Sequence, residues 1–230
     1  MTQLALIELP TIKLLEKFGS GTHAPGSGSA AALMGLIGCR LISTVAAISL
    51  RKPEYKRDHS RIGFITDRVN DTLDPSLREL FQQDAMVFDE VIKMRVARDA
   101  AIDDKEKRRY SELALERLRE ATDIPFKIGD SCLELIDYGT ALFDMGFKGA
   151  RGDTGAAISA AVAGAMSAVF VINLNLKSFR GSEWAMQQRK RCDDFHQRLS
   201  RKQLDAFGRV MTLRAEDVSS IGLNFEVEES

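Results

Sequence analysis

The sequence predicts an all-α fold, a single-domain helical bundle with two central helices that are rich in small residues. No segment shows sustained alternation of apolar and polar residues between turn signals, which is the pattern of half-buried strands. The prolines stand mostly at or just before the start of helix-like patterns, where proline suits the first helical turn. No linker rich in Pro, Gly and Ser divides the chain, so we expect one domain over residues 1–218 and a disordered tail over 219–230.

Proline and capping signals place the predicted helices in order along the chain. Pro53, Pro75 and Pro125 each start a helix-like pattern, and Asp74 and Asp123 stand before two of them as candidate caps. The stretch VFVINLNL resembles a strand, but it follows a long Ala-rich run, which favours the end of a helix. We therefore expect helices near residues 10–18, 28–50, 54–71, 75–97, 104–121, 125–145, 154–178 and 183–215.

Two of these helices carry small residues at steps of three and four, which leaves one face almost without side-chain bulk. These residues are Gly28, Ala31, Ala32, Gly35, Gly38 and Cys39 in one helix, and Gly155, Ala156, Ser159, Ala160, Ala163, Gly164, Ser167 and Ala168 in the other. Glycine inside a helix costs about 1 kcal/mol relative to alanine, so its repetition indicates close approach to a neighbour. We expect the two helices to be central, packed against each other or across a subunit interface.

Residues 154–176 carry no charge and are long enough to be weighed as a transmembrane span. Much of this run is Ala, Gly and Ser, which gain little in lipid, and we expect no second span beside it. The N-terminus has no basic region ahead of an apolar run, so no signal peptide is predicted. The composition therefore favours a buried helix of a soluble protein and no membrane partner.

The charge balance argues against a polyanionic partner. Lys and Arg number 32 against 33 Asp and Glu, a net charge of -1, so no global field attracts nucleic acid. The last helix has an apolar stripe with basic residues elsewhere, and its acidic residues break the basic run, which favours a docked amphipathic helix over a nucleic-acid arm. The stripe consists of Trp184, Cys192, Phe195, Leu199, Ala206 and Val210. The 3 cysteines are far apart, as expected for reduced thiols in a cytoplasmic protein.

Asp84 is the most informative anomaly, because it falls near the middle of the apolar face of the helix expected at 75–97. A carboxylate there either finds a partner or has a raised pKa, and both make it a functional candidate. The structural alternative is an aspartate that caps a neighbouring helix or pairs with an arginine. Asp153 has the alternative role of an N-cap, and Asn175 either satisfies a backbone group or contacts a ligand.

Other chemical signatures are absent from the sequence. It has no Walker sequence, no nucleophile elbow and no HExxH, and its histidines, His23, His59 and His196, are scattered. We therefore expect no metal site. The run RKPEYKR at 51–57 either holds a polyanion or is a solvated helix junction.

Four segments, in matching order, resemble the cyclodeaminase/cyclohydrolase family. PGSGSAAALMGLIGCRLISTVAAISL is similar to the family's Pro-Gly-Gly-Gly-Ser helix entry, and RKPEY to its Gly-Lys-Lys-x-Tyr segment. QQDAMVFDEV resembles the Asp-Ala-x-Ala-Phe segment, and GARGDTGAAISAAVAGAMSAVFVINLNLKS resembles the Ser-Asp-x-Gly helix that ends in Ile-Asn-Leu-Lys-Ser. The resemblance covers about residues 5–180.

The resemblance implies an all-helical homodimer that binds a tetrahydrofolate derivative in a cleft, with no tightly bound cofactor. It implies catalytic roles for Asp84 and Asp153, and a place for Lys52 or Arg51 at the glutamate tail of the folate. The substrate-binding residues that it implies are Gly26, Ser27, Gly28, Ser29, Lys52, Tyr55 and Asn175. The chemistry is hydrolysis of methenyltetrahydrofolate to 10-formyltetrahydrofolate, or the release of ammonia from formiminotetrahydrofolate.

Three departures from the family pattern leave a third alternative open. Ser27 replaces the middle glycine, Pro53 replaces a second lysine, and Val171 stands where relatives often have Asn. A side chain at Ser27 narrows a place where backbone meets ligand, and Val171 removes a polar contact. The alternatives are therefore a cyclohydrolase, a cyclodeaminase, and a catalytically silent helical scaffold that binds folate or protein.

Overall fold

The structure is a computed structural model of the chain, and it describes residues 5–179 and 181–212. The predicted tail over 219–230 lies outside the described residues. Within them there is no strand, which confirms the all-α prediction. The helices are α1 (Thr11–Phe18), α2 (Ser27–Leu50), α3 (His59–Arg68), α4 (Asp74–Ala100), α5 (Asp104–Met145), α6 (Arg151–Leu176) and α7 (Glu183–Thr212). Shorter helical turns are η1 (Leu6–Glu8), η2 (Pro53–Asp58), η3 (Val69–Leu73) and η4 (Lys148–Ala150).

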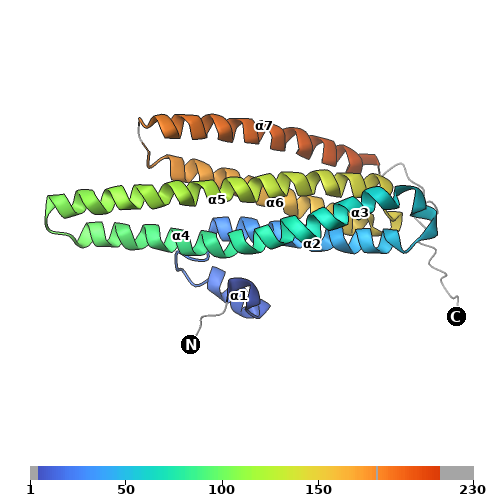
Figure 1. The fold of residues 1–230 in the computed structure, drawn as a ribbon, viewed down its shortest axis with the longest axis horizontal. Helices are drawn as coiled ribbons and strands as arrows, with labels where there is room; N and C mark the ends of the chain where they lie inside the picture. Colours follow the sequence, from blue (N-terminus) through green and yellow to red (C-terminus); the bar gives the residue numbers. More distant parts are fainter. Residues whose placement is uncertain (1–4, 180, 213–230) are drawn as a thin grey trace.

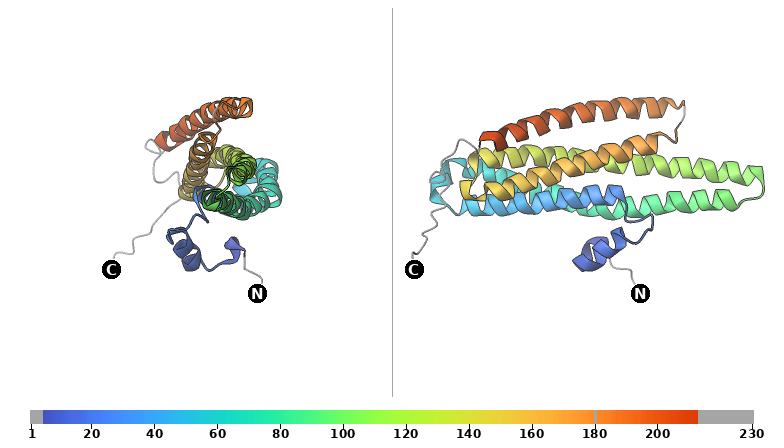
Figure 2. Two further views of the ribbon diagram at one scale, coloured as in Figure 1. Left: turned by 90° about the vertical axis from the view of Figure 1, so that its left-hand side faces the viewer. Right: turned by 180° about the vertical axis from the view of Figure 1, so that it is seen from behind.

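The helices form an elongated bundle whose long axis is set by α4 and α5 (Figure 1). These two helices form an antiparallel hairpin, and its closed end extends past the start of α2. Helices α2 and α6 fill the other side of the bundle, and α7 lies along α5 and α6 (Figure 2). Helix α1 lies on the outside, where Phe18 stacks on Phe81 of α4.

Helices α2 and α6 pack against each other through their small residues. A Cβ added to Gly38 would lie 3.3 Å from the carbonyl oxygen of Ala157, and one added to Gly164 would lie 2.9 Å from that of Ala31. Contacts this close leave no room for a larger side chain. The two helices therefore pack against each other within the chain, which is the first of the two predicted arrangements. They run antiparallel.

Two helices, Ser27–Leu50 and Lys148–Leu176, are long and apolar enough to cross a membrane by length and composition alone. This corrects the expectation that residues 154–176 have no second candidate span beside them. In the bundle, 50% and 44% of their most apolar windows are buried, and core helices of soluble proteins pass the same test.

The predicted breaks before Pro75 and Pro125 are wrong. Residues 59–100 form one nearly continuous helical rod, in which the π-helical turn η3 leads directly into Pro75. π turns and prolines are both common sites at which a long helix kinks without ending. Pro125 lies inside α5, and Asp123, expected to be a cap, instead pairs with Lys127 at 3.0 Å and with Arg191 at 3.3 Å.

Asn175 explains how α5 tolerates Pro125. A proline inside a helix has no N–H, so the carbonyl four residues earlier, that of Ala121, loses its helical partner. The side-chain amide of buried Asn175 donates to this oxygen at 3.0 Å. A residue of α6 thus completes the hydrogen bonding of α5, and the predicted backbone-satisfying role of Asn175 is confirmed.

Asn175→Ala is expected to lower the free energy of unfolding by about 1–3 kcal/mol, because it leaves the buried Ala121 carbonyl without a donor. Pro125→Ala returns an N–H to that carbonyl, so Asn175→Ala should cost much less in the Pro125→Ala background. Urea unfolding of the four proteins of this double-mutant cycle measures the difference. Equal costs in both backgrounds would show that Asn175 does not serve the proline.

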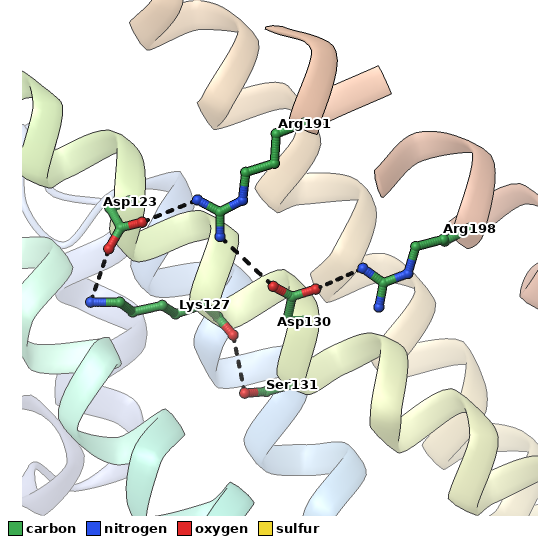
Figure 3. A network of polar contacts seen from close by, with 6 residues as sticks. All are labelled: Asp123, Lys127, Asp130, Ser131, Arg191 and Arg198. Atoms are coloured by element: carbon green, nitrogen blue, oxygen red, sulfur yellow. Dashed lines mark hydrogen bonds and ion pairs between the residues drawn. The ribbon is translucent and has the colours of Figure 1, made fainter. Parts of the chain in front are cut away.

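Charged pairs hold α7 along α5 in parallel register. The acidic residues of α5 recur every seven positions, and their partners on α7 follow in the same order. The pairs are Asp123 with Arg191, Asp130 with Arg198, Asp137 with Lys202 and Asp144 with Arg209. Figure 3 shows the first two, with Arg191 placed between Asp123 and Asp130. Beneath them Cys192, Phe195, Leu199 and Ala206 are buried, so α7 is the docked amphipathic helix that the sequence predicts.

Candidate active site

A cavity of about 370 Å³ opens where the N-terminus of α2 meets α4 and the end of α6. The loop before α2 and its first turn supply one wall, α4 supplies the second, and the last turn of α6 with the residues after it supplies the third. The lining residues are His23, Gly26, Ser27, Gly28, Asp84, Phe88, Arg95, Val171, Leu174, Asn175 and Ser178. The cavity therefore contains part of the predicted site, drawn from three distant parts of the sequence.

Asp84 caps α2 from a neighbouring helix. Helix α2 has glycine at its N-cap and no side-chain cap of its own. The Asp84 carboxylate accepts a hydrogen bond from the Ser29 hydroxyl at 2.8 Å and another from the Ser29 backbone N–H. The structural alternative predicted for Asp84, a cap on a neighbour, is thus observed, and Asp84 also lines the cavity.

Burial raises the pKa of Asp84 above its ordinary value, and the hydrogen bonds from Ser29 oppose that rise. The side chain is only 7% exposed. A carboxylate with a raised pKa is a better proton acceptor, and at the edge of a cavity its charge is weakly screened. The arrangement can therefore take a proton from a ligand or stabilise a positive charge on it.

Gly28 is needed for Asp84 to reach this position. A Cβ on Gly28 would lie 2.0 Å from Oδ1 and 2.6 Å from Cγ of Asp84, far inside contact distance. Ser27 is exposed at the first position of α2 and lines the cavity, as its place in the glycine-rich entry predicts. The backbone N–H groups of Ser27 and Gly28 belong to the helix start, where no intrahelical acceptor is available. The entry thus offers free donors beside a carboxylate.

Lys52, Tyr55 and Asp153 are not part of this cavity. The 24 residues of α2 separate Gly28 from Lys52 and Tyr55 by roughly 35 Å, at 1.5 Å per residue. Lys52 stacks over Phe147, with its Nζ 4.3 Å from the ring centroid, and the Tyr55 hydroxyl accepts from the Lys148 N–H at 3.2 Å.

Asp153 lies at that same far end of the bundle. It is exposed in the first turn of α6, which begins at Arg151, so it is not the N-cap that the sequence suggested. About 33 Å of helix separates it from Asn175, at 1.5 Å per residue. Within one chain the predicted site residues therefore fall into two groups at opposite ends.

Several cavity residues were not singled out from the sequence as site residues, notably His23, Phe88 and Arg95. A signal for two of them was present. Phe88 and Arg95 follow Asp84 by four and eleven positions, which places all three on one face of α4. Val171, noted in the sequence as a departure, does lie in the cavity wall, so the wall is apolar there.

The chain is similar in sequence to several known proteins. A sequence model described as formiminotransferase-cyclodeaminase matches residues 10–194. A methenyltetrahydrofolate cyclohydrolase of Methylorubrum extorquens is 27% identical over 176 residues, which cover 76% of this chain and 83% of that protein. A formimidoyltransferase-cyclodeaminase of Sus scrofa is 25% identical over 188 residues, which cover 81% of this chain and 34% of that protein.

The fold also matches a solved structure. The crystal structure of formiminotetrahydrofolate cyclodeaminase from Thermotoga maritima aligns with a TM-score of 0.78 over 90% of this chain and 98% of that one. Its sequence identity is 16%, so the match bears on the fold alone. The family model covers most of the chain, including every wall of the cavity. This chain therefore belongs to the formiminotransferase-cyclodeaminase family.

Proposed function

We propose that this protein is a methenyltetrahydrofolate cyclohydrolase, which adds water to the methenyl bridge and gives 10-formyltetrahydrofolate. The observation that carries the proposal is Asp84, a buried carboxylate whose raised pKa and position at a cavity suit general-base chemistry. The similarity to a cyclohydrolase over 83% of its length supports this reaction over the alternatives.

The methenyl bridge carries a delocalised positive charge, and a carboxylate beside it stabilises that cation. Asp84 takes a proton from the attacking water as the water oxygen bonds to the bridge carbon. The new hydroxyl then loses its remaining proton as the carbon–oxygen double bond forms and the bond from that carbon to N5 breaks. N5 takes up one proton, and the formyl group stays on N10. The sum consumes one water and releases one proton, so the proposal includes no tightly bound cofactor.

The alternative is a formiminotetrahydrofolate cyclodeaminase, named by the similarity to the Sus scrofa protein. Here the bridge closes and ammonia leaves. The leaving nitrogen must gain a proton, and a carboxyl group with a raised pKa is suited to donate it. Asp84 could thus serve either reaction, and the substrate distinguishes them.

Two assays test the proposal. Purified protein is mixed with methenyltetrahydrofolate, and the loss of its near-ultraviolet absorbance is compared with the spontaneous rate. Ammonia release from formiminotetrahydrofolate is measured in parallel. Accelerated hydrolysis supports the cyclohydrolase, ammonia release without it supports the cyclodeaminase, and neither activity means a silent scaffold.

We also propose that the protein works as a homodimer. Met166, Phe170 and Leu174 form an exposed apolar stripe at four-residue steps on α6, and Phe170 is 65% exposed. Leu174 also lines the candidate cavity, so a second copy that covers the stripe would border the site. In such a dimer the partner copy could supply the Lys52, Tyr55 and Asp153 end that lies far from Asp84 within one chain.

A shared site predicts complementation. Asp84→Asn and Asp153→Asn are each expected to be inactive alone, and a mixture refolded together should regain activity. The reason is that every mixed dimer then has one site with both aspartates intact. Asp84→Asn mixed with the double variant Asp84→Asn/Asp153→Asn is the control and should stay inactive. Full activity of Asp153→Asn alone, or a monomer by sedimentation, would contradict the shared site.

A further inference from the structure

Residues of opposite charge line the cavity from α4. Asp84, Phe88 and Arg95 line it from a single face of this helix. At 1.5 Å per residue, the eleven positions from Asp84 to Arg95 span about 16 Å. Asp84 is buried against Ser29 in the first turn of α2, whereas Arg95 is half-buried and closer to the C-terminal end of α4. That end of α4 extends past the start of α2 (Figure 1).

Arg95 differs from the basic residues beside it, which are paired within the described part of the chain. Lys93 pairs with Asp89 at 2.6 Å, and Arg98 pairs with Asp99 at 2.8 Å. Among the residues that the structure describes, none forms an ion pair or hydrogen bond with Arg95. A guanidinium offers a planar fork of donors that matches carboxylates. The side chain is thus a cation in a cavity wall, free to meet an anion.

We propose that Arg95 binds the glutamate carboxylates of the folate substrate and so fixes the direction in which folate enters the cavity. The inference rests on the proposed function. Methenyltetrahydrofolate has its positive charge at the bridge and its negative charges at the glutamate, with an aminobenzoyl ring between them. The cavity presents a carboxylate, then the aromatic ring of Phe88, then a guanidinium, which is the complementary order.

Within one chain this assignment differs from the one that the sequence suggested for the glutamate tail. Lys52 and Arg51 lie at the far end of α2, roughly 35 Å from Gly28 at 1.5 Å per residue. Lys52 also already contacts Phe147 and Glu54. Among the described residues of one chain that line the cavity, Arg95 is the one with a permanent positive charge.

Arg95→Gln tests the inference with two substrates, methenyltetrahydrofolate and methenyltetrahydropteroate, which lacks the glutamate. The KM for the full substrate is expected to rise about 10- to 100-fold with kcat little changed, because a charge-assisted contact made equally in ground and transition states is lost. The KM for the truncated substrate should not change. Lys93→Gln, two residues away and paired with Asp89, is the matched control and should match wild type with both substrates.

Calorimetry with tetrahydrofolate and tetrahydropteroate gives a readout independent of turnover. Wild type should bind tetrahydrofolate more tightly, and Arg95→Gln should bind the two equally. An equal loss for both ligands, or no loss for either, overturns the role of Arg95. If turnover is absent but Arg95-dependent preference for tetrahydrofolate persists, the proposed reaction fails and the binding role stands. If wild type binds neither ligand, both proposals fail.

Discussion

Asp84→Asn is expected to lower kcat/KM for methenyltetrahydrofolate by about 100- to 10,000-fold, the range typical for removal of a general base. The amide has the shape of the carboxylate and can still accept the hydrogen bond from the Ser29 hydroxyl. It can neither take a proton from water nor balance the charge of the methenyl bridge. Absorbance decay above the spontaneous rate measures the loss.

The same variant should not lose stability near neutral pH. Burial raises the pKa of Asp84 in the folded chain, so its charged form is less favourable there than in the unfolded chain. Asp84→Asn removes the free-energy cost of burying this charge, which wild type bears at every pH above the folded-state pKa. Urea unfolding of Asp84→Asn should therefore match or exceed wild type, and unfolding cannot account for lost activity.

The pH profile gives an independent check. As a base, Asp84 must be ionised, so kcat/KM of wild type should fall as the pH drops through its pKa, which lies above the ordinary 3.8. Asp84→Asn should lack this acid limb once the spontaneous rate is subtracted. A wild-type profile that is flat on the acid side, or a limb that survives in the variant, would assign the base to another group.

Asp74→Asn is the matched control, because Asp74 is the other buried carboxylate of α4. It contacts Arg40 and Arg78, outside the cavity. Its loss should lower stability, since the two arginines lose their shared partner, and should leave kcat/KM of the folded protein unchanged. Asp74→Asn is thus expected to lose stability and keep its activity, whereas Asp84→Asn is expected to keep its stability and lose activity.

The sequence predicted the helical class and the two central helices because these depend on local patterns. Small residues repeated at helical steps indicate where another backbone comes close, and Gly38 and Gly164 do contact the facing helix. The break at Pro125 was wrong because the group that rescues it, Asn175, comes from a helix about 50 residues later. No local rule could supply that partner.

The candidate site was predicted only in part, for a different physical reason. Motifs at Gly26 to Ser29, Asp84 and Asn175 converge because α2, α4 and α6 are neighbours, which the sequence order does not reveal. The sequence alone could have shown that Lys52 is far from Gly28 within one chain. The helix expected at 28–50 is more than 30 Å long at 1.5 Å per residue. Arg95 could have been found by identifying the residues of this helix that share a face with Asp84.

Gly28→Ala is expected to reduce activity about as much as Asp84→Asn and to lower the free energy of unfolding by about 1–3 kcal/mol, the range for overpacking. The new methyl group would stand 2.0 Å from Asp84 Oδ1, so the carboxylate must leave its place against Ser29. The sign of the change in unfolding free energy makes this prediction informative. In an ordinary helix interior alanine is about 1 kcal/mol better than glycine, so the opposite result implies a contact that glycine alone permits.

Two further variants test that cause. Gly63→Ala in α3 is the control, because nothing lies within 4 Å of its added Cβ, and it should stabilise the protein slightly. In an Asp84→Ala background the clash has no partner, so Gly28→Ala should then cost nothing or add stability, as measured by urea unfolding. If Gly28→Ala destabilises both backgrounds equally, the glycine serves the backbone of α2 rather than Asp84. If the cost disappears, a glycine at the helix entry and a carboxylate 56 positions later act as one unit, and the missing Cβ keeps the base in the cavity wall.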